Sequence, residues 1–245
     1  MRTRNATYRI YADLIGNDAE ETRVHDVRQS GQDLAARLAE TYTGVIYDVM
    51  RDAGREVRTL PSTLRPLRPD ARLAGPVFTV EGAIDESLEV HRTMLEWTGL
   101  LQETPAGHVL VCQPNDSTIA HMGELSAETL QLRGVRGYVV DGGCRDTDMV
   151  RELGFPVWRR YDTPADIRGR WAPTALGEPI RIGEVTVTTG DYLLADEDGV
   201  VLIPGEDVAE VVAAAEAAMQ QENLVRAAIR DGTPPREAYL RHGKF

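Results

Sequence analysis

The stretch from Gly123 to Asp146 constrains the fold more than any other part of the sequence. Apolar residues recur at helical spacing from Leu125 to Leu132, and Gly134 follows them as a helix stop. The apolar, β-favouring run at 138–140 then ends at an Asp-Gly-Gly turn. The pattern predicts a helix, a turn and a strand, and it places Arg145 and Asp146 after the end of the strand, at the edge of a sheet.

We expect the end of this strand to meet the start of the helix. If the two pack antiparallel, Glu124, Leu125 and Ser126 lie near Arg145 and Asp146. A helix N-terminus has unpaired N–H groups and favours an anion, and an arginine can hold a carboxylate through two hydrogen bonds. Aspartate and glutamate are hard oxygen ligands for Mg²⁺ or Mn²⁺, directly or through water. These residues predict a site that binds a small 2-oxo acid by its carboxylate and polarises its carbonyl group.

Each of these residues also has a simpler structural interpretation. Asp146 precedes a short predicted helix at 147–154 and would serve as its N-cap. Glu124 would be an acidic first-turn residue that the helix dipole favours, and Arg145 would neutralise its neighbours. Cys144 is a candidate nucleophile if Arg145 lowers its pKa, or else it fills the turn. The spacing alone leaves these alternatives open.

The composition indicates a globular α/β protein. The chain has 245 residues, of which 42% are hydrophobic, and residues 31–245 are expected to form a single α/β domain after an N-terminal extension or arm at 1–30. A net charge of −12 disfavours nucleic-acid binding. Two cysteines, no signal-peptide pattern and no long apolar run predict a cytoplasmic protein without a membrane segment.

The remaining elements follow from periodicity and turn residues. Two helices are expected within 33–53, with Thr43 capping the second, and the proline-rich segment 60–70 is expected to be a loop or sheet edge. The other expected elements are strands at 77–80, 109–112 and 156–158, a helix at 89–99, hairpin strands within 179–204 and a helix at 206–230.

Four further patterns could contribute to a site. The polar loop 113–117 is expected to line the pocket, and the arginine-rich segment 159–173 could steer dicarboxylates or simply be solvated. His121 and Glu124 have a His-x-x-Glu spacing, but without companion ligands we interpret His121 as a hydrogen-bonded structural histidine rather than a zinc ligand. The acidic run 196–199 is interpreted as a turn, because it lacks the other ligands of a calcium loop.

Five separate motifs occur in an order typical of one known family. They lie at 73–80, 123–127, 133–146, 152–158 and 190–201. Together they resemble the family of the regulator of ribonuclease activity A, which includes the class II 4-hydroxy-4-methyl-2-oxoglutarate / 4-carboxy-4-hydroxy-2-oxoadipate aldolases. The resemblance covers about residues 33–240. It implies the layered, swivelling-type β/α sandwich of this family, assembled as a homotrimer or hexamer with active sites between subunits.

The resemblance also assigns roles to the predicted site. The family's aldolases carry an acidic residue, twenty intervening residues and then Arg-Asp, which Glu124, Arg145 and Asp146 match, with Glu where the aldolases have Asp. It implies that Asp146 binds Mg²⁺ or Mn²⁺, that Glu124 holds a metal-bound water, and that Arg145 with the amides of Leu125 and Ser126 binds pyruvate. A glutamate of the C-terminal helix, best matched by Glu222, would approach the metal from a neighbouring subunit, although an ordinary surface pair with Arg226 is an equal alternative.

The activity that the resemblance implies is metal-dependent retro-aldol cleavage of a 4-hydroxy-2-oxo acid to pyruvate and a keto acid, with possible oxaloacetate decarboxylation. A Schiff-base mechanism is disfavoured because Lys244, at the C-terminus, is the only lysine. The alternatives are a non-catalytic protein-binding regulator of a ribonuclease, which the family also contains, and another lyase that acts on keto or hydroxy acids.

Overall fold

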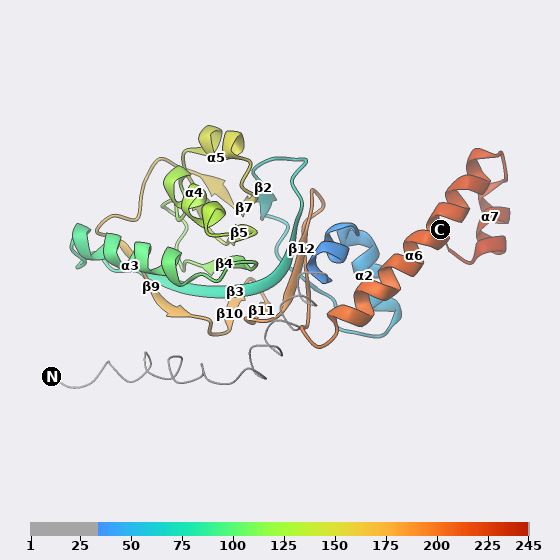
Figure 1. Cartoon of the computed structure of the whole chain (residues 1–245), viewed down its shortest axis with the longest axis horizontal. Helices are drawn as coiled ribbons and strands as arrows, with labels where there is room; N and C mark the ends of the chain where they lie inside the picture. The colour runs from blue at the N-terminus through green and yellow to red at the C-terminus, as the bar shows by residue number, and fades with distance from the viewer. Residues whose placement is uncertain (1–33, 245) are drawn as a thin grey trace, which may run out of the picture.

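A long strand, β3, joins the two halves of a mixed sheet in the computed structural model, which describes residues 34–244 (Figure 1). Its first residues pair antiparallel with β12, as Leu194 opposite Ala74 shows, and its middle pairs parallel with β4, where Val77 lies opposite Val109. The sheet runs, in spatial order, through β1 (Arg58–Thr59), β13 (Val200–Ile203), β12 (Tyr192–Ala195), β3 (Leu73–Ile84), β4 (Val109–Gln113), β5 (Gly137–Val140), β7 (Val157–Arg159) and β2 (Arg65–Pro66). A further strand, β9 (Trp171–Leu176), pairs antiparallel with the end of β3, with a shift of register between Glu81 and Gly82.

The parallel half of the sheet positions the pocket. Strands β3, β4, β5 and β7 are parallel neighbours, and helices α3 (Val90–Glu103), α4 (Glu124–Leu132) and α5 (Thr147–Leu153) lie on one side of them (Figure 1). All four residues of β5 are buried, as expected for a strand covered on both faces. The loops that follow β4 and β5 therefore meet at one edge of the sheet, where open α/β sheets commonly bind ligands.

Other elements cover the rest of the sheet. The hairpin of β10 (Ile180–Ile182) and β11 (Val185–Val187) closes a core with β4 and β12, while α2 (Thr43–Asp52) and α6 (Val208–Arg230) pack on the β12–β13 side. Helix α6 projects away from the sheet, and α7 (Pro235–His242) turns back beside it (Figure 1). Two short strands, β6 (Gly143–Cys144) and β8 (Tyr161–Asp162), pair in parallel next to the pocket.

The structure confirms the predicted layered α/β fold, the loop or sheet edge predicted at 60–70, where β2 ends the sheet, and the hairpins within 179–204. It corrects the predicted cap of the second helix. Tyr42 occupies the N-cap, and the amide and hydroxyl of Thr43 donate to the carboxylate of Asp196 at 2.9 and 2.8 Å. Asp196 thus lies in the predicted acidic turn and caps α2 from across the fold.

Two predictions about organisation are not tested by this structure. The expected arm at 1–30 lies outside the described residues, and the single domain at 31–245 stays a prediction. Among the helices of residues 34–244, none is long and apolar enough to cross a bilayer.

Candidate active site

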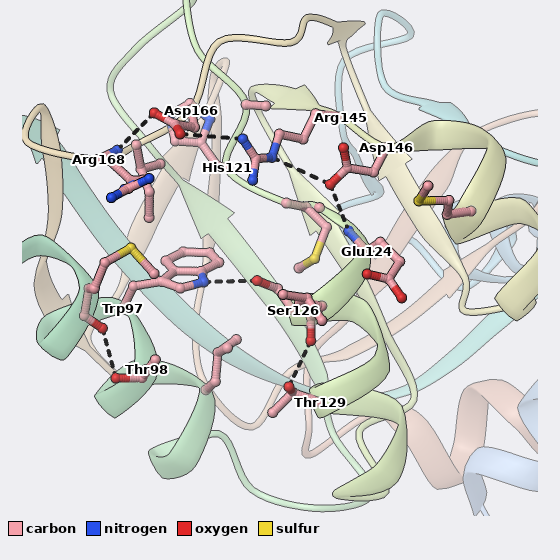
Figure 2. A pocket seen from close by; sticks show the side chains of 18 residues that line it. Trp97, Thr98, His121, Glu124, Ser126, Thr129, Arg145, Asp146, Asp166 and Arg168 are labelled. Carbon is pink, nitrogen blue, oxygen red and sulfur yellow. Dashed lines mark hydrogen bonds and ion pairs between the residues drawn. The ribbon is translucent and has the colours of Figure 1, made fainter. Parts of the chain in front are cut away.

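A pocket of about 390 Å³ opens between α3, α4 and the loop at 166–168 (Figure 2). Its volume is within the range of small-molecule sites. It contains five of the six residues that the sequence analysis named for the site, Glu124, Leu125, Ser126, Arg145 and Asp146. The polar loop 113–117 does not line this pocket, so that prediction is wrong; Asn115 instead hydrogen bonds to Glu81 and Gly82.

Arg145 lies between two carboxylates at the centre of the pocket (Figure 2). Its Nε is 3.4 Å from Oδ2 of Asp146, and its Nη1 is 3.4 Å from Oδ2 of Asp166. Both contacts are long, and the Arg145 side chain is 39% exposed, so each ion pair contributes little to stability. Nη2 donates no hydrogen bond to another described residue. The interpretation that Arg145 neutralises its neighbours is correct in part, yet the guanidinium retains donors for a ligand.

Asp146 stands at the N-cap position of α5 but does not act as a cap. Its backbone is in the left-handed region, with φ 52° and ψ 35°, and its side chain makes no capping hydrogen bond to α5. Aspartate is one of the few residues enriched in that region. Oδ2 instead accepts the N–H of Glu124, at 3.2 Å. The turn after β5 therefore joins Asp146 to the start of α4, as the antiparallel packing predicted.

The first turn of α4 is arranged to receive an anion. The amides of Leu125 and Ser126 have no hydrogen-bond partner among residues 34–244. Gly123 brings this turn close to the acidic and basic side chains, because a Cβ there would lie 2.7 Å from Oδ2 of Asp146 and 3.1 Å from Nε of Arg145. Free N–H groups, the positive end of the helix dipole and a guanidinium group thus converge on one volume.

The acidic side of the same pocket carries oxygen ligands of the kind that divalent cations prefer. Three carboxylates line it, those of Glu124, Asp146 and Asp166, against two guanidinium groups. Oδ1 of Asp146 and the carboxylate of Glu124 accept no hydrogen bond within the described chain. The described residues hold no group of three or more candidate metal ligands. Mg²⁺ in proteins usually keeps several waters and binds through one or two carboxylates, so these side chains could hold it only in that way.

Asp166 and Trp97 are pocket residues that sequence reasoning missed. Oδ1 of Asp166 accepts the N–H of Arg168 at 3.2 Å and lies 3.4 Å from Nη2 of Arg170, while Oδ2 faces Arg145. The buried Trp97 donates from Nε1 to Oγ of Ser126 at 2.9 Å. No motif marked either residue; the nearest signal was the position of Asp166 within the arginine-rich segment.

Glu222 lies outside the pocket of its own chain. Its carboxylate accepts a hydrogen bond from the Tyr42 hydroxyl and is 3.9 Å from Nζ of Lys244. Burial of the ring, together with this hydrogen bond, raises the pKa of Tyr42 to about 12. The structure therefore does not bring Glu222 together with the other predicted site residues of the same chain, and a role in a neighbouring subunit stays a prediction.

His121 lines the pocket as a buried residue against the edge of Trp171, with ring centroids 5.4 Å apart. Burial lowers its pKa to about 4, against the opposing effect of Asp116, whose Oδ2 lies 3.5 Å from Nε2. The ring is therefore neutral at pH 7. The ring makes no hydrogen bond within the described part of the chain, so the predicted hydrogen bonding is wrong, and the structural role of His121 stays a prediction.

Comparison with known proteins identifies the family. The model of the RraA-like family, described as Aldolase/RraA, matches residues 43–202. The chain belongs to the RraA-like family. A candidate 4-hydroxy-4-methyl-2-oxoglutarate aldolase of Halalkalibacterium halodurans is 30% identical over 192 residues, which are 77% of this chain and 87% of the relative. The 4-hydroxy-4-methyl-2-oxoglutarate aldolase of Thermus thermophilus is 32% identical over 159 residues, or 63% and 90% of the two chains.

A solved RraA-like structure extends the similarity to the fold. Streptomyces coelicolor RraAS2, described as an unusual member of the RNase ES inhibitor RraA protein family, superposes with a TM-score of 0.69 and 28% identity. The match covers 79% of this chain and 96% of that one. The relatives of this RraA-like chain thus include proteins named as aldolases and a member of an inhibitor family.

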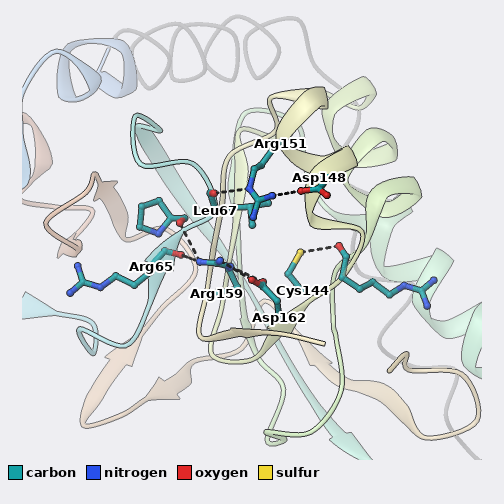
Figure 3. A network of polar contacts seen from close by, with 9 residues as sticks. Arg65, Leu67, Cys144, Asp148, Arg151, Arg159 and Asp162 are labelled. Atoms are coloured by element: carbon teal, nitrogen blue, oxygen red, sulfur yellow. Dashed lines mark hydrogen bonds and ion pairs between the residues drawn. The ribbon is translucent and has the colours of Figure 1, made fainter. Parts of the chain in front are cut away.

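Cys144 is not a nucleophile in this RraA-like chain. It is fully buried, its Sγ donates to the carbonyl oxygen of Arg145 at 3.3 Å (Figure 3), and burial raises its pKa to about 12. Burial also raises the pKa of Cys112 to about 12. A thiol with such a pKa is almost entirely protonated near neutral pH, so the alternative in which Arg145 activates Cys144 is wrong.

We predict that both thiols resist modification in the folded protein. At pH 8, Ellman's reagent should label fewer than about 0.1 thiols per chain within an hour in the native protein, because the thiolate fraction and the access are both small. Both thiols should react within minutes in 6 M guanidinium chloride, which serves as the control for total thiol. Rapid labelling of one thiol per native chain would contradict the burial of Cys144.

Proposed function

We propose that this RraA-like protein is a divalent-metal-dependent carbon–carbon lyase that cleaves a 4-hydroxy-2-oxo acid of the 4-hydroxy-4-methyl-2-oxoglutarate type. The products would be pyruvate and a second keto acid. The observation that carries the proposal is the convergence of Arg145, Asp146 and the unpaired amides of Leu125 and Ser126 in one pocket. The aldolase names of two relatives at 30 and 32% identity support the same reaction class.

The chain's own groups would hold the pyruvate half of the substrate. Arg145 can donate two parallel hydrogen bonds to the C1 carboxylate, and the amides of Leu125 and Ser126 can donate to the same anion. Cleavage of the C3–C4 bond moves its electron pair into the pyruvate half, which becomes an enolate, while the C4 hydroxyl loses its proton to water and becomes the carbonyl of the second keto acid. The enolate then takes up a proton from water at C3 and becomes pyruvate. Donors fixed around the growing negative charge stabilise the transition state more than the substrate, and this difference accelerates cleavage.

The acidic residues would hold the cofactor. Asp146 would bind Mg²⁺ or Mn²⁺ directly and Glu124 through a water molecule, and the bound cation would polarise the 2-oxo group as a Lewis acid. Glutamate in place of aspartate at 124 adds one methylene, which is compatible with a contact through water. Oxaloacetate decarboxylation would follow at the same site, because loss of its C4 carboxylate leaves the same enolate of pyruvate.

The proposal includes assembly as a homotrimer or hexamer. Glu222 belongs to the second half of α6 and does not line the pocket of its own chain, so in this proposal it approaches the site of a neighbouring copy. A homo-oligomer would therefore complete the acidic side of the pocket.

The test is release of pyruvate from 4-hydroxy-4-methyl-2-oxoglutarate and from oxaloacetate, measured with Mg²⁺, with Mn²⁺ and with a chelator. We expect turnover that needs the cation and that falls by at least about 100-fold in Asp146→Ala, because this change removes the proposed metal ligand. Asp148→Ala, with an exposed carboxylate at the start of α5, is the matched control and should retain activity. Absence of turnover in the folded wild type, together with no bound metal, would overturn the proposal.

A second candidate function rests on the similarity to Streptomyces coelicolor RraAS2, whose description places it in an RNase ES inhibitor family. On that alternative the chain would bind a ribonuclease without chemistry of its own. The pyruvate assay separates the two functions, since a protein-binding regulator needs neither the cation nor Asp146.

A further inference from the structure

The arginine-rich segment at 159–173 is largely neutralised in the fold. Arg159 donates to the carboxylate of Asp162 at 2.9 and 3.0 Å (Figure 3), and Nη1 of Arg160 lies 3.4 Å from Oδ1 of Asp141. Arg170 faces Asp166 at 3.4 Å. The segment is therefore not a general basic surface that would steer anions, and only an arginine without an acidic partner could bind one.

Arg168 is the exception. Its side chain makes no hydrogen bond or ion pair within residues 34–244, and it lines the pocket at the exposed end of the loop. In Figure 2 it lies on the α3 side of the pocket, and Asp166 stands between it and Arg145. The pocket thus has a second cationic group, separate from the one that faces Asp146.

The backbone that carries Arg168 is fixed. Its N–H donates to Oδ1 of Asp166 at 3.2 Å, and the N–H of Gly169 donates to Oγ1 of the buried Thr93 on α3 at 3.1 Å. Gly169 has φ +67°, which a residue with a Cβ adopts rarely. A rigid loop that presents an unpaired guanidinium group at a pocket is suited to bind an anion.

Part of the pocket lining is apolar. Met94, Trp97 and Leu101 of α3 and Ile167 of the loop line it. A ligand held at Arg145 by one carboxylate would therefore meet apolar side chains along its chain and a cation at its far end. The matching ligand is a 2-oxo acid with an uncharged middle and a second carboxylate.

We propose that Arg168 binds the distal carboxylate of the substrate and so makes the pocket selective for 2-oxo dicarboxylates over 2-oxo monocarboxylates of equal length. The inference rests on the proposed function, because it assumes that the first carboxylate is held at Arg145. Arg168 is a specificity-determining residue in this account, and bond cleavage itself does not require it.

The test compares two ligands that differ only at the far end. Calorimetry in the presence of Mg²⁺ would measure the Kd of 2-oxoglutarate and of 2-oxopentanoate. The second compound also has five carbons, but a methyl group replaces the second carboxylate. Wild type should prefer 2-oxoglutarate by roughly ten-fold, because a hydrogen bond between two charged groups is strong while the rim is open to water. Arg168→Gln should abolish this preference, and Arg168→Lys should keep part of it.

Arg160→Gln is the matched control, since it removes a guanidinium of the same segment that faces Asp141 outside the pocket, and it should keep the preference. Equal affinity of wild type for both ligands, or an unchanged preference in Arg168→Gln, would overturn the inference. If either result is found and the wild-type protein still releases pyruvate from 4-hydroxy-4-methyl-2-oxoglutarate, the proposed function stands without the role of Arg168. Binding of neither 2-oxo acid, with no pyruvate release, would overturn both.

Discussion

Replacement of Arg145 by glutamine should lower kcat/KM for pyruvate release by roughly 100- to 1000-fold, the range found when a donor to developing negative charge is removed. Glutamine keeps much of the side chain's length and polarity but loses the charge and the paired donors. The fold should change little, because the two ion pairs of Arg145 are long and partly exposed. Steady-state kinetics with thermal melting of the same samples would measure both effects.

Arg160→Gln is a closely matched control for this experiment. The Arg160 side chain is also 39% exposed and also lies 3.4 Å from a carboxylate, that of Asp141, but it does not line the pocket. It should therefore retain near wild-type kinetics. A loss of activity in Arg145→Gln that is no larger than the loss in Arg160→Gln would show that Arg145 has only an electrostatic, structural role.

The largest expected effect on stability comes from Gly82→Ala. A Cβ at Gly82 would lie 1.8 Å from Cζ2 of the fully buried Trp171, whose Nε1 donates to the carbonyl oxygen of Pro114 at 2.8 Å. The indole cannot shift without losing this hydrogen bond and its edge contact with Trp97. We expect a loss of about 3 kcal/mol or more in the free energy of unfolding, at the upper end for overpacked cores.

Thermal and denaturant unfolding would measure this effect, with an expected decrease in Tm of roughly 6–12 °C for a chain of this size. Gly99→Ala is the control, because it adds the same methyl group within α3 where no heavy atom lies within 4 Å apart from the neighbouring residues and the backbone of the helix itself. It should be neutral or stabilising by up to about 1 kcal/mol through helix propensity. An unchanged Tm in Gly82→Ala would contradict the packing described around Trp171.

Local sequence patterns predicted how the candidate site residues lie relative to one another. Helical spacing after Gly123, a β-favouring run and an Asp-Gly-Gly turn together determine where Arg145 and Asp146 lie relative to the start of α4. This part could be predicted because all three elements are contiguous in the chain. The close approach at Gly123 follows from the same unit.

What the sequence did not predict depends on contacts between distant segments. Asp196 caps α2 from 153 residues away, and Trp171 fills the space that Gly82 leaves beside β3. Neither contact has a periodic pattern. Whether each arginine of the arginine-rich segment is paired likewise depends on which acidic side chains the fold places beside it. Arg168 therefore could not be distinguished from Arg160 before the structure was known.

The most direct test of the central claim is whether this pocket stabilises the enolate of pyruvate, and it needs no knowledge of the full substrate. Proton NMR in D₂O would follow exchange of the pyruvate methyl protons for deuterium in the presence of the protein and Mg²⁺. We predict exchange well above the metal-only background, abolished by a chelator and by Arg145→Gln but retained in Arg160→Gln. A folded wild-type protein that exchanges pyruvate no faster than Mg²⁺ alone would contradict the account.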